Sequence, residues 1–343
     1  MFLEARLILR PAVVFPVSRR RPVLLAHRGS AVSASAALGC PVPENSRAAF
    51  DWAVSCSAVS GLETDIHATT DGVPVISHDP LWYAADGEIA IAEVSWAELC
   101  RHRLPNGEQP FSLEEFLDRY PNIYLNIDAK TDAVVPGALR VLQGRQDLGR
   151  LALASFSARR VWKMARHLGP GCGYLPGARD IARLLGGAAA GLVRPVHPKI
   201  RGIEIPWETI FSSERESGSA WRLEANTRCV VSGLAEKRYM ERLYRFGIVP
   251  RLCRDFHCAL AVPESVPGMR IVTPRFVAAA HSLGCPVYVW TVNDLASYRR
   301  LVSLGVDGIY TDIVSTLAQN GALRKLPASR QKLLQYQGIL NEF

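Results

Sequence analysis

Two short sequence motifs contain residues that can transfer protons and bind phosphate. The first is Ala-His-Arg-Gly at 26–29. The second runs from Gly61 to Asp65 and is followed by Ser-His-Asp-Pro at 77–80. Together they supply two histidines, His27 and His78, two carboxylates two residues apart, and an arginine. Histidines transfer protons, carboxylates hold divalent cations, and arginine binds phosphate oxygens. This combination is what metal-assisted attack on a phosphodiester requires.

The paired carboxylates, Glu63 and Asp65, lie within a strand-like run. Residues two apart on a strand point to the same face, about 6–7 Å apart at a rise of ~3.3 Å per residue. Such charges repel unless a cation lies between them, and oxygen ligands favour Mg²⁺ or Ca²⁺. The alternative is an exposed strand face with solvated charges. Asp128 and Lys130 repeat the spacing, so Asp128 is expected to complete a metal triad and Lys130 to neutralise a phosphate oxygen.

Three further positions are expected near these carboxylates. Asp71-Gly72 is a tight-turn signal, after which residues 73–77 would fold back and bring His78 and Asp79 close. Asp79 has an alternative role in the turn itself. Trp290 ends a later strand, where its ring can form a pocket wall or pack in the core.

The chemical residues follow apolar runs that are typical of short strands. Eight such runs alternate with helix-like segments, and they cover residues 23–26, 61–66, 122–127, 151–155, 171–175, 259–262, 286–291 and 308–310. Eight β/α units within about 300 residues predict an α/β fold, a closed (β/α)8 or TIM barrel. In such barrels the active site lies at the carboxyl ends of the strands. His27, Glu63 and Asp128 occur there.

One domain is expected over residues 22–318, with an N-terminal extension at 1–21 and a C-terminal tail at 319–343. The apolar runs of the extension precede the basic cluster at 19–21 instead of following it, which is the reverse of a secretory signal. We therefore expect the extension to be retained.

Asp312 ends the last strand, and a structural or polar-network role is expected for it.

Two regions depart from the regular pattern. Residues 30–42 are small and mostly apolar, and they predict a long loop after the first strand. Around 210–258 the β/α period is lost, which predicts an irregular insertion. The sixth strand is assigned to 259–262, with 203–206 as the alternative, because the first choice leaves a normal loop before the next helix.

The composition indicates which kinds of ligand or partner the chain could bind. The chain has 343 residues, a net charge of +8 and 48% hydrophobic residues, which suits a soluble protein with an anionic small-molecule ligand. The basic residues are scattered, so nucleic-acid binding is not expected, and no run is long enough for a membrane span. The eight cysteines form no CxxC pair, which favours buried thiols and a reducing, cytoplasmic location.

An ordered series of motifs resembles the glycerophosphodiester phosphodiesterase family, whose members are (β/α)8 barrels. The resemblance runs from about residue 24 to residue 313 and is weakest at 203–260. Its motifs are found at residues 26–29, 43–46, 49–50, 63–66, 70–72, 77–79, 289–293 and 305–312.

The resemblance implies a role for each matching residue. His27 and His78 would be the acid–base pair, and Glu63, Asp65 and the third-strand carboxylate would hold one divalent cation, Mg²⁺ or Ca²⁺. The family commonly has Glu at the third ligand position, where this chain has Asp128. Arg28 and Lys130 would bind phosphate, with Trp290 at the pocket wall. Glu44 matches a family carboxylate at the site edge, and the adjacent Asn45 would order the loop.

The expected activity is metal-dependent hydrolysis of glycerophosphodiesters to glycerol 3-phosphate and an alcohol. Two alternatives stay open at this point: a lysophospholipase D-like or sphingomyelinase D-like lipid phosphodiesterase, and an inactive barrel that binds a phosphate ligand. The segment that recognises glycerol in the family falls at 81–108 and is short here, so diester hydrolysis is the more secure expectation. The headgroup and the oligomeric state are not indicated.

Overall fold

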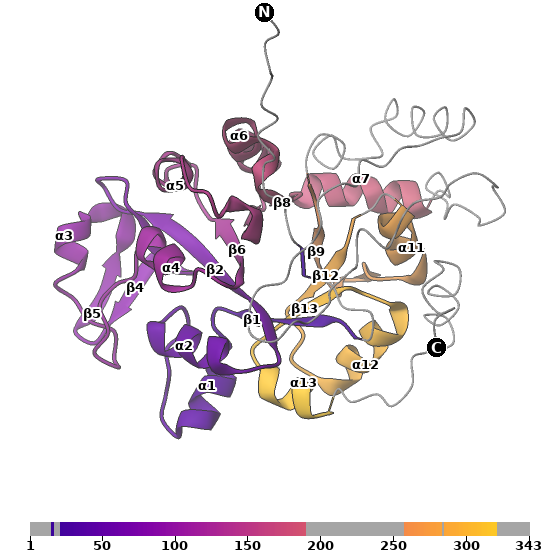
Figure 1. Cartoon of the computed structure of the whole chain (residues 1–343), viewed down its shortest axis with the longest axis horizontal. Helices are drawn as coiled ribbons and strands as arrows, with labels where there is room; N and C mark the ends of the chain where they lie inside the picture. The colour runs from indigo at the N-terminus through magenta and orange to yellow at the C-terminus, as the bar shows by residue number, and fades with distance from the viewer. Residues whose placement is uncertain (1–14, 17–20, 190–256, 283–284, 321–343) are drawn as a thin grey trace, which may run out of the picture.

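The computed structural model describes residues 15–16, 21–189, 257–282 and 285–320. Eight parallel strands in these ranges curl into a nearly closed barrel, with helices on the outside (Figure 1). The strands, in chain order, are β1 (Val23–His27), β2 (Val59–Ala68), β6 (Tyr124–Ala129), β7 (Leu151–Ala154), β8 (Gly173–Leu175), β9 (Leu260–Pro263), β12 (Val287–Trp290) and β13 (Gly308–Thr311). A parallel bridge between Tyr174 and Cys258 joins the two edges of the sheet. The predicted α/β (β/α)8 barrel is therefore confirmed.

In the described part of the chain, the helices below lie between the barrel strands or after the last one, and all except α13 occupy segments where the sequence pattern predicts a helix. They are α2 (Arg47–Ser55), α4 (Leu113–Arg119), α5 (Val134–Leu142), α6 (Ala158–Leu168), α7 (Ala178–Ala189), α11 (Pro274–Ser282), α12 (Leu295–Leu304) and α13 (Val314–Asn320). The Ser46 and Ser112 hydroxyls accept hydrogen bonds from backbone N–H groups of α2 and α4, as expected of N-caps. Strand β9 matches the predicted sixth strand, whereas the alternative at 203–206 and the predicted insertion at 210–258 lie outside the described residues, apart from 257–258.

The loop predicted at 30–42 is wrong, because helix α1 (Ala31–Leu38) forms there. Four of its eight residues are alanine, which has the highest intrinsic helix propensity. Gly39 ends the helix in the left-handed conformation, with a φ of 69°. The first strand is thus followed by a short ordered helix beside the barrel mouth, where the Ser33 hydroxyl donates to the Asp312 carbonyl.

A small unit projects beyond the mouth after the second strand. Strand β2 runs on into a hairpin with β3 (Pro74–Ile76), which confirms the turn predicted at Asp71-Gly72. There follow β4 (Leu81–Ala84), β5 (Gly87–Ala90), a 3-10 turn η1 (Ile91–Glu93) and α3 (Trp96–Leu99). Trp82, Ile91 and Leu99 form a separate small core under this unit.

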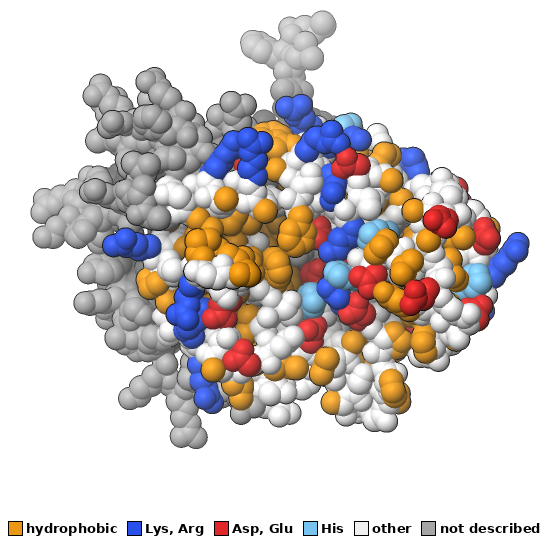
Figure 2. Space-filling model, turned by 180° about the vertical axis from the view of Figure 1, so that it is seen from behind, with side chains coloured by type: hydrophobic (Ala, Val, Ile, Leu, Met, Phe, Trp, Pro, Cys, Tyr) orange, Lys and Arg blue, Asp and Glu red, His pale blue; other side chains and the backbone are white. Residues whose placement is uncertain are grey.

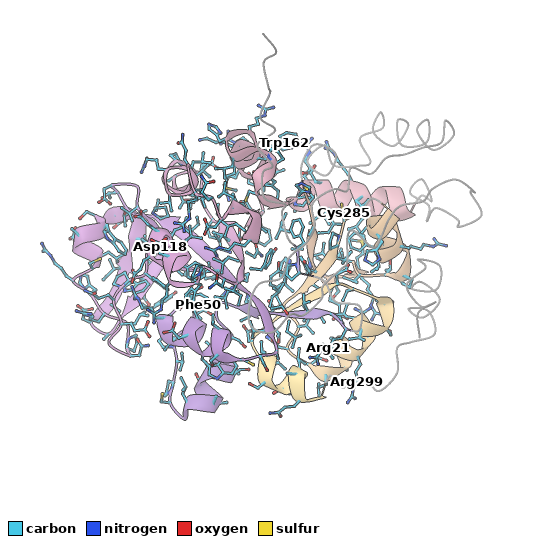
Figure 3. All side chains as sticks on the ribbon, in the orientation of Figure 1. Arg21, Phe50, Asp118, Trp162, Cys285 and Arg299 are labelled. Atoms are coloured by element: carbon cyan, nitrogen blue, oxygen red, sulfur yellow. The ribbon has the colours of Figure 1, made fainter. Side chains whose placement is uncertain are left out.

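The barrel strands have two buried faces. Alternate residues point outward against the helices, as Leu24 and Ala26 do, or inward to the barrel axis, as Leu25 does. Phe50 of α2 lies in the outer layer, against the aromatic rings of α4 and its flanks (Figure 3). Gly61 has no side chain because a Cβ there would lie 2.6 Å from Leu25.

Near the amino-terminal end of the barrel, a residue of the extension adds to the inner layer. The Phe15 ring lies 6.3 Å from the Tyr124 ring and 6.4 Å from the Tyr288 ring, centroid to centroid. The Tyr288 hydroxyl also donates to the Pro16 carbonyl at 2.8 Å. No helix in the described part of the chain is long and apolar enough to cross a membrane.

Candidate active site

The first strand ends in a tightly wound turn that carries the first motif. Arg28, Gly29 and Ser30 all have positive φ angles, 48°, 82° and 54°, an uncommon conformation for residues other than glycine. A Cβ at Gly29 would lie 2.7 Å from the Ala49 Cβ, so this position requires glycine. The turn directs the Arg28 backbone N–H at Glu63, to which it donates at 3.1 Å.

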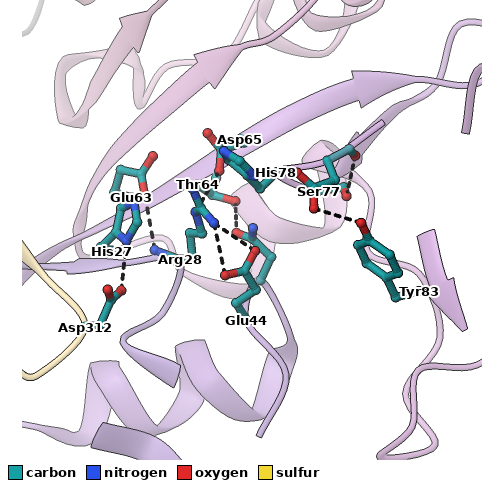
Figure 4. Close-up of polar contacts among 12 residues, drawn as sticks. His27, Arg28, Glu44, Glu63, Thr64, Asp65, Ser77, His78, Tyr83 and Asp312 are labelled. Carbon is teal, nitrogen blue, oxygen red and sulfur yellow. Dashed lines mark hydrogen bonds and ion pairs between the residues drawn. The ribbon is translucent and has the colours of Figure 1, made fainter. Parts of the chain in front are cut away.

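His27 is oriented by a carboxylate from the last strand. Its Nδ1 lies 2.8 Å from Asp312 Oδ1 (Figure 4). An ionised carboxylate only accepts, so Nδ1 carries the proton and Nε2, 3.9 Å from Glu63 Oε2, faces the site. Asn293 donates to the other Asp312 oxygen at 2.6 Å. Burial alone lowers the pKa of His27, but the Glu63 and Asp312 carboxylates raise it above its usual value.

His78 forms a second pair of the same kind. Its Nδ1 lies 2.8 Å from Asp79 Oδ1, and the Tyr83 hydroxyl donates to the other Asp79 oxygen at 3.1 Å. The main chain of His78 is also held, because His67 Nε2 lies 3.0 Å from the His78 carbonyl oxygen and must donate to it. Asp79 therefore does more than shape the turn, and both candidate catalytic histidines present Nε2 with Nδ1 engaged.

The three predicted carboxylates meet on adjacent strands. Asp65 of β2 and Asp128 of β6 are directly paired in the parallel ladder, and Glu63 lies two residues before Asp65. All three side chains are buried. Burial, with the neighbouring Asp65 charge, raises the pKa of Glu63 to about 8, and burial raises the pKa of Asp128. The alternative in which Glu63 and Asp65 lie on an exposed strand face is therefore wrong. Three carboxylates are instead buried close together at the barrel mouth.

The two predicted phosphate-binding cations lie against this acidic group. Lys130 Nζ is 2.7 Å from Asp65 Oδ1 and 3.0 Å from Asp128 Oδ2. The Arg28 guanidinium is 3.6 Å from Asp65 Oδ2 and donates to both oxygens of Glu44 at 3.0 and 3.1 Å. Glu44 therefore holds Arg28 at the site edge. Figure 4 draws Arg28 between the two histidines.

The carboxylates offer oxygens that a divalent cation can use. Asp65 Oδ2 and Asp128 Oδ1 are buried and have no hydrogen-bond partner, and such buried oxygens are costly unless a ligand satisfies them. Within the described ranges, no three carboxylate, histidine or cysteine side chains are grouped tightly enough to form a coordination set. Lys130 lies between two of the three predicted ligands. The donor chemistry fits a hard cation, provided that Lys130 moves aside.

Two other residues predicted from the sequence border this centre. Two residues near it, His67 and Phe156, were not predicted. Trp290 is partly buried at the end of β12 and contacts the Phe156 ring at 5.8 Å. Asn45 orders the loop, since its side-chain oxygen accepts from Thr64 at 2.7 Å. His67 was missed although it repeats the two-residue spacing of Glu63 and Asp65. Phe156 was missed because nothing in the sequence around it signals a site.

Comparison with known proteins identifies the family. The model of the glycerophosphoryl diester phosphodiesterase family matches residues 27–166 and 222–316. A probable glycerophosphodiester phosphodiesterase 2 of Mycobacterium tuberculosis is 26% identical over 291 residues, covering 84% of this chain and 87% of that protein. A glycerophosphodiester phosphodiesterase of Caldanaerobacter subterraneus is 25% identical over 318 residues, covering 87% of this chain and 96% of that protein.

Solved structures agree in fold. An Oleispira antarctica phosphodiesterase in complex with the product sn-glycerol-3-phosphate is 20% identical with a TM-score of 0.55, covering 87% of this chain and 96% of that one. A glycerophosphoryl diester phosphodiesterase domain from Mycobacterium tuberculosis is 17% identical with a TM-score of 0.57, covering 88% of this chain and 99% of that one. With the matched motifs on the same barrel, this chain belongs to the glycerophosphoryl diester phosphodiesterase family and is a phosphoric diester hydrolase.

Proposed function

We propose that the chain hydrolyses glycerophosphodiesters to glycerol 3-phosphate and an alcohol, with His27 and His78 as the acid–base pair. The observation that carries this proposal is the pair of imidazoles, each oriented through Nδ1 by its own aspartate at 2.8 Å. An acid and a base with their Nε2 atoms presented are what a displacement at phosphorus needs. A barrel that only binds phosphate would require neither pair.

Charge at the mouth supports phosphate binding. Arg28 and Lys130 are the cations at the site, and each contacts a buried carboxylate while keeping donors for a ligand. In the reaction, one imidazole takes a proton from the nucleophile, either water or the glycerol 2-hydroxyl. Attack by water gives glycerol 3-phosphate directly, whereas attack by the 2-hydroxyl gives a cyclic phosphate, which a water molecule must open in a second displacement to give glycerol 3-phosphate. An oxygen–phosphorus bond forms, the bond to the leaving oxygen breaks, and the other imidazole gives that oxygen a proton.

One divalent cation, Mg²⁺ or Ca²⁺, is part of the proposal. Glu63, Asp65 and Asp128 would hold it, because their buried oxygens include two without a hydrogen-bond partner. When bound, the cation would polarise a phosphate oxygen and stabilise the charge that grows there. Asp128 is one methylene shorter than the glutamate common in the family. The cytoplasmic location expected from the cysteines stays a prediction.

Activity of single-histidine variants tests the acid–base assignment. His27→Ala and His78→Ala should each lower kcat for glycerophosphocholine by roughly 10²–10⁴-fold, the contribution of one positioned acid or base. His167→Ala is the matched control, because His167 is exposed on α6 and its Nδ1 lies 2.7 Å from the Lys163 carbonyl oxygen of the same helix. Near wild-type turnover in either site variant, with the barrel folded, would refute the assignment.

Calorimetric titration tests the metal assignment separately. Mg²⁺ and Ca²⁺ should bind the wild-type protein with one site and bind Asp65→Asn at least tenfold more weakly, because the variant loses a charged buried ligand. Chelator should remove activity, and added cation should restore it. Unchanged affinity in Asp65→Asn would overturn the ligand assignment while leaving the histidine prediction standing.

A further inference from the structure

The His78–Asp79 pair has a third member, which comes from strand β4. The Tyr83 hydroxyl donates to Asp79 Oδ2 at 3.1 Å, while His78 Nδ1 bonds to Asp79 Oδ1 at 2.8 Å (Figure 4). Both oxygens of this carboxylate are therefore engaged, which fixes its plane relative to the imidazole. Figure 2 shows histidine side chains beside acidic side chains near the middle of one face of the molecule, where a ligand can reach them.

The His27 pair is built in the same way from different elements. Asp312 accepts from His27 with one oxygen and from Asn293 with the other. Asn293 follows β12 of the barrel, whereas Tyr83 belongs to β4 of the projecting unit. Each candidate catalytic histidine thus has an aspartate, and each aspartate has a second donor. This repetition indicates that the second donor helps to orient the carboxylate.

A packed strand places the Tyr83 hydroxyl. In the pairing of β4 with β5, Tyr83 lies opposite Glu88. The preceding residue, Trp82, is buried in the small core of the projecting unit. Successive strand residues point to opposite faces, so Tyr83 is turned outward and is 48% exposed. The Ile91 N–H donates to the Pro80 carbonyl and ties the start of β4 to the unit. The hydroxyl therefore comes from a fixed element.

The bond between Tyr83 and Asp79 joins a neutral donor to a charged acceptor at neutral pH. The hydrogen bond to Asp79 raises the pKa of the Tyr83 phenol above its usual value. Burial raises the pKa of Asp79, but the bonds from His78 and Tyr83 lower it below its usual value. The phenol therefore keeps its proton while the carboxylate is ionised, and such charge-assisted bonds are the stronger ones.

We propose that Tyr83 is a positioning residue for His78, which it keeps aligned with the reacting oxygen by holding the Asp79 carboxylate in place. The proposal rests on the acid–base role proposed above for His78 and adds a residue on which that role depends. The imidazole transfers the proton in the reaction, and the phenol keeps its hydrogen bond to Asp79 throughout. A side chain of the projecting unit thereby contributes to turnover at the barrel mouth.

A double-mutant cycle tests this role. Tyr83→Phe removes only a hydroxyl from an exposed side chain, so the denaturation midpoint should not change. With glycerophosphocholine, kcat should fall about three- to tenfold, the effect of one hydrogen bond partly open to solvent, and KM should stay within twofold. The same fall should recur in the His27→Ala background. In the His78→Ala background Tyr83→Phe should have no further effect, because the side chain that it positions is gone. Enzyme concentrations are raised until the slow variants give measurable turnover.

Tyr120→Phe is the matched control. The Tyr120 hydroxyl also donates to an aspartate, Asp51 Oδ1 at 2.8 Å, but its ring packs against Phe50 in the outer layer of the barrel. This variant should keep kcat within twofold of wild type.

The outcomes separate this inference from the proposed function. An unchanged kcat in Tyr83→Phe would overturn the positioning role, and so would an equal fall in the His27→Ala and His78→Ala backgrounds. A higher KM with unchanged kcat would also overturn it, because that result would indicate that the phenol binds substrate. Each of these results leaves the hydrolase proposal intact. Wild-type kcat in His78→Ala would overturn both proposals.

Discussion

The Asp312→Asn substitution would remove the charge that orients His27 while preserving side-chain shape. Asp312 accepts from His27 Nδ1 at 2.8 Å and from Asn293 at 2.6 Å. A hydrogen bond to a charged group contributes about 1.5–3 kcal/mol. If that energy holds the imidazole in its productive tautomer during the reaction, kcat/KM should fall about 10- to 100-fold.

The pH dependence gives the same experiment a second readout. The Asp312 charge is one of the factors that raise the pKa of His27, whereas burial lowers it. Removing the charge should therefore shift the His27 limb of the kcat/KM profile to lower pH. A variant that merely loosened the fold would lower activity without moving that limb.

Asp307→Asn is the matched control. Asp307 precedes β13 and pairs with His281 Nε2 at 2.7 Å, whereas Asp312 follows the same strand. Both changes remove one aspartate from a histidine pair, but only Asp312 is at the mouth. The assay is steady-state hydrolysis of glycerophosphocholine across pH. Asp312→Asn activity within twofold of wild type, with an unshifted profile, would refute the reasoning.

Two further substitutions test the geometry around the histidines. Gly29→Ala should lower the free energy of unfolding by about 1–3 kcal/mol, because its Cβ would lie 2.7 Å from Ala49 in a left-handed turn; denaturant unfolding measures this, and an unchanged midpoint would contradict it. His67→Leu should lower kcat/KM about tenfold, since the His78 carbonyl loses its side-chain donor. His67→Gln, which can still donate, should recover part of that loss, and equal activity in the two variants would argue against the positioning role.

Much of the fold could be predicted because each barrel strand is a short apolar run with turn and cap signals on both sides. Residues such as Ser112, whose hydroxyl caps α4, mark helix starts directly in the sequence. Helix α1 could not be predicted in this way. Its alanines and serines show no apolar period, and its position depends on tertiary contacts with the last strand's end.

The residues of the candidate site could be predicted from the sequence, but the side chains that they bond to could not. The spacing of Glu63 and Asp65 places both on one face, as a strand requires. The bond between His27 and Asp312 joins residues 285 positions apart, and only barrel closure brings them together. Lys130 was expected to contact phosphate, yet its ammonium lies between the Asp65 and Asp128 carboxylates. Buried carboxylates are costly unless a cation compensates their charge, and Lys130 is the neighbouring cation.

The contact of Phe15 with Tyr124 and Tyr288 makes the amino-terminal segment a reporter of barrel closure. The two tyrosines belong to β6 and β12, strands on opposite halves of the β/α series. Phe15 can contact both only after the halves have assembled around the axis. A probe attached just before Phe15 would therefore report barrel assembly from outside the active site. A tag placed there would add bulk at the end of the barrel opposite the candidate active site.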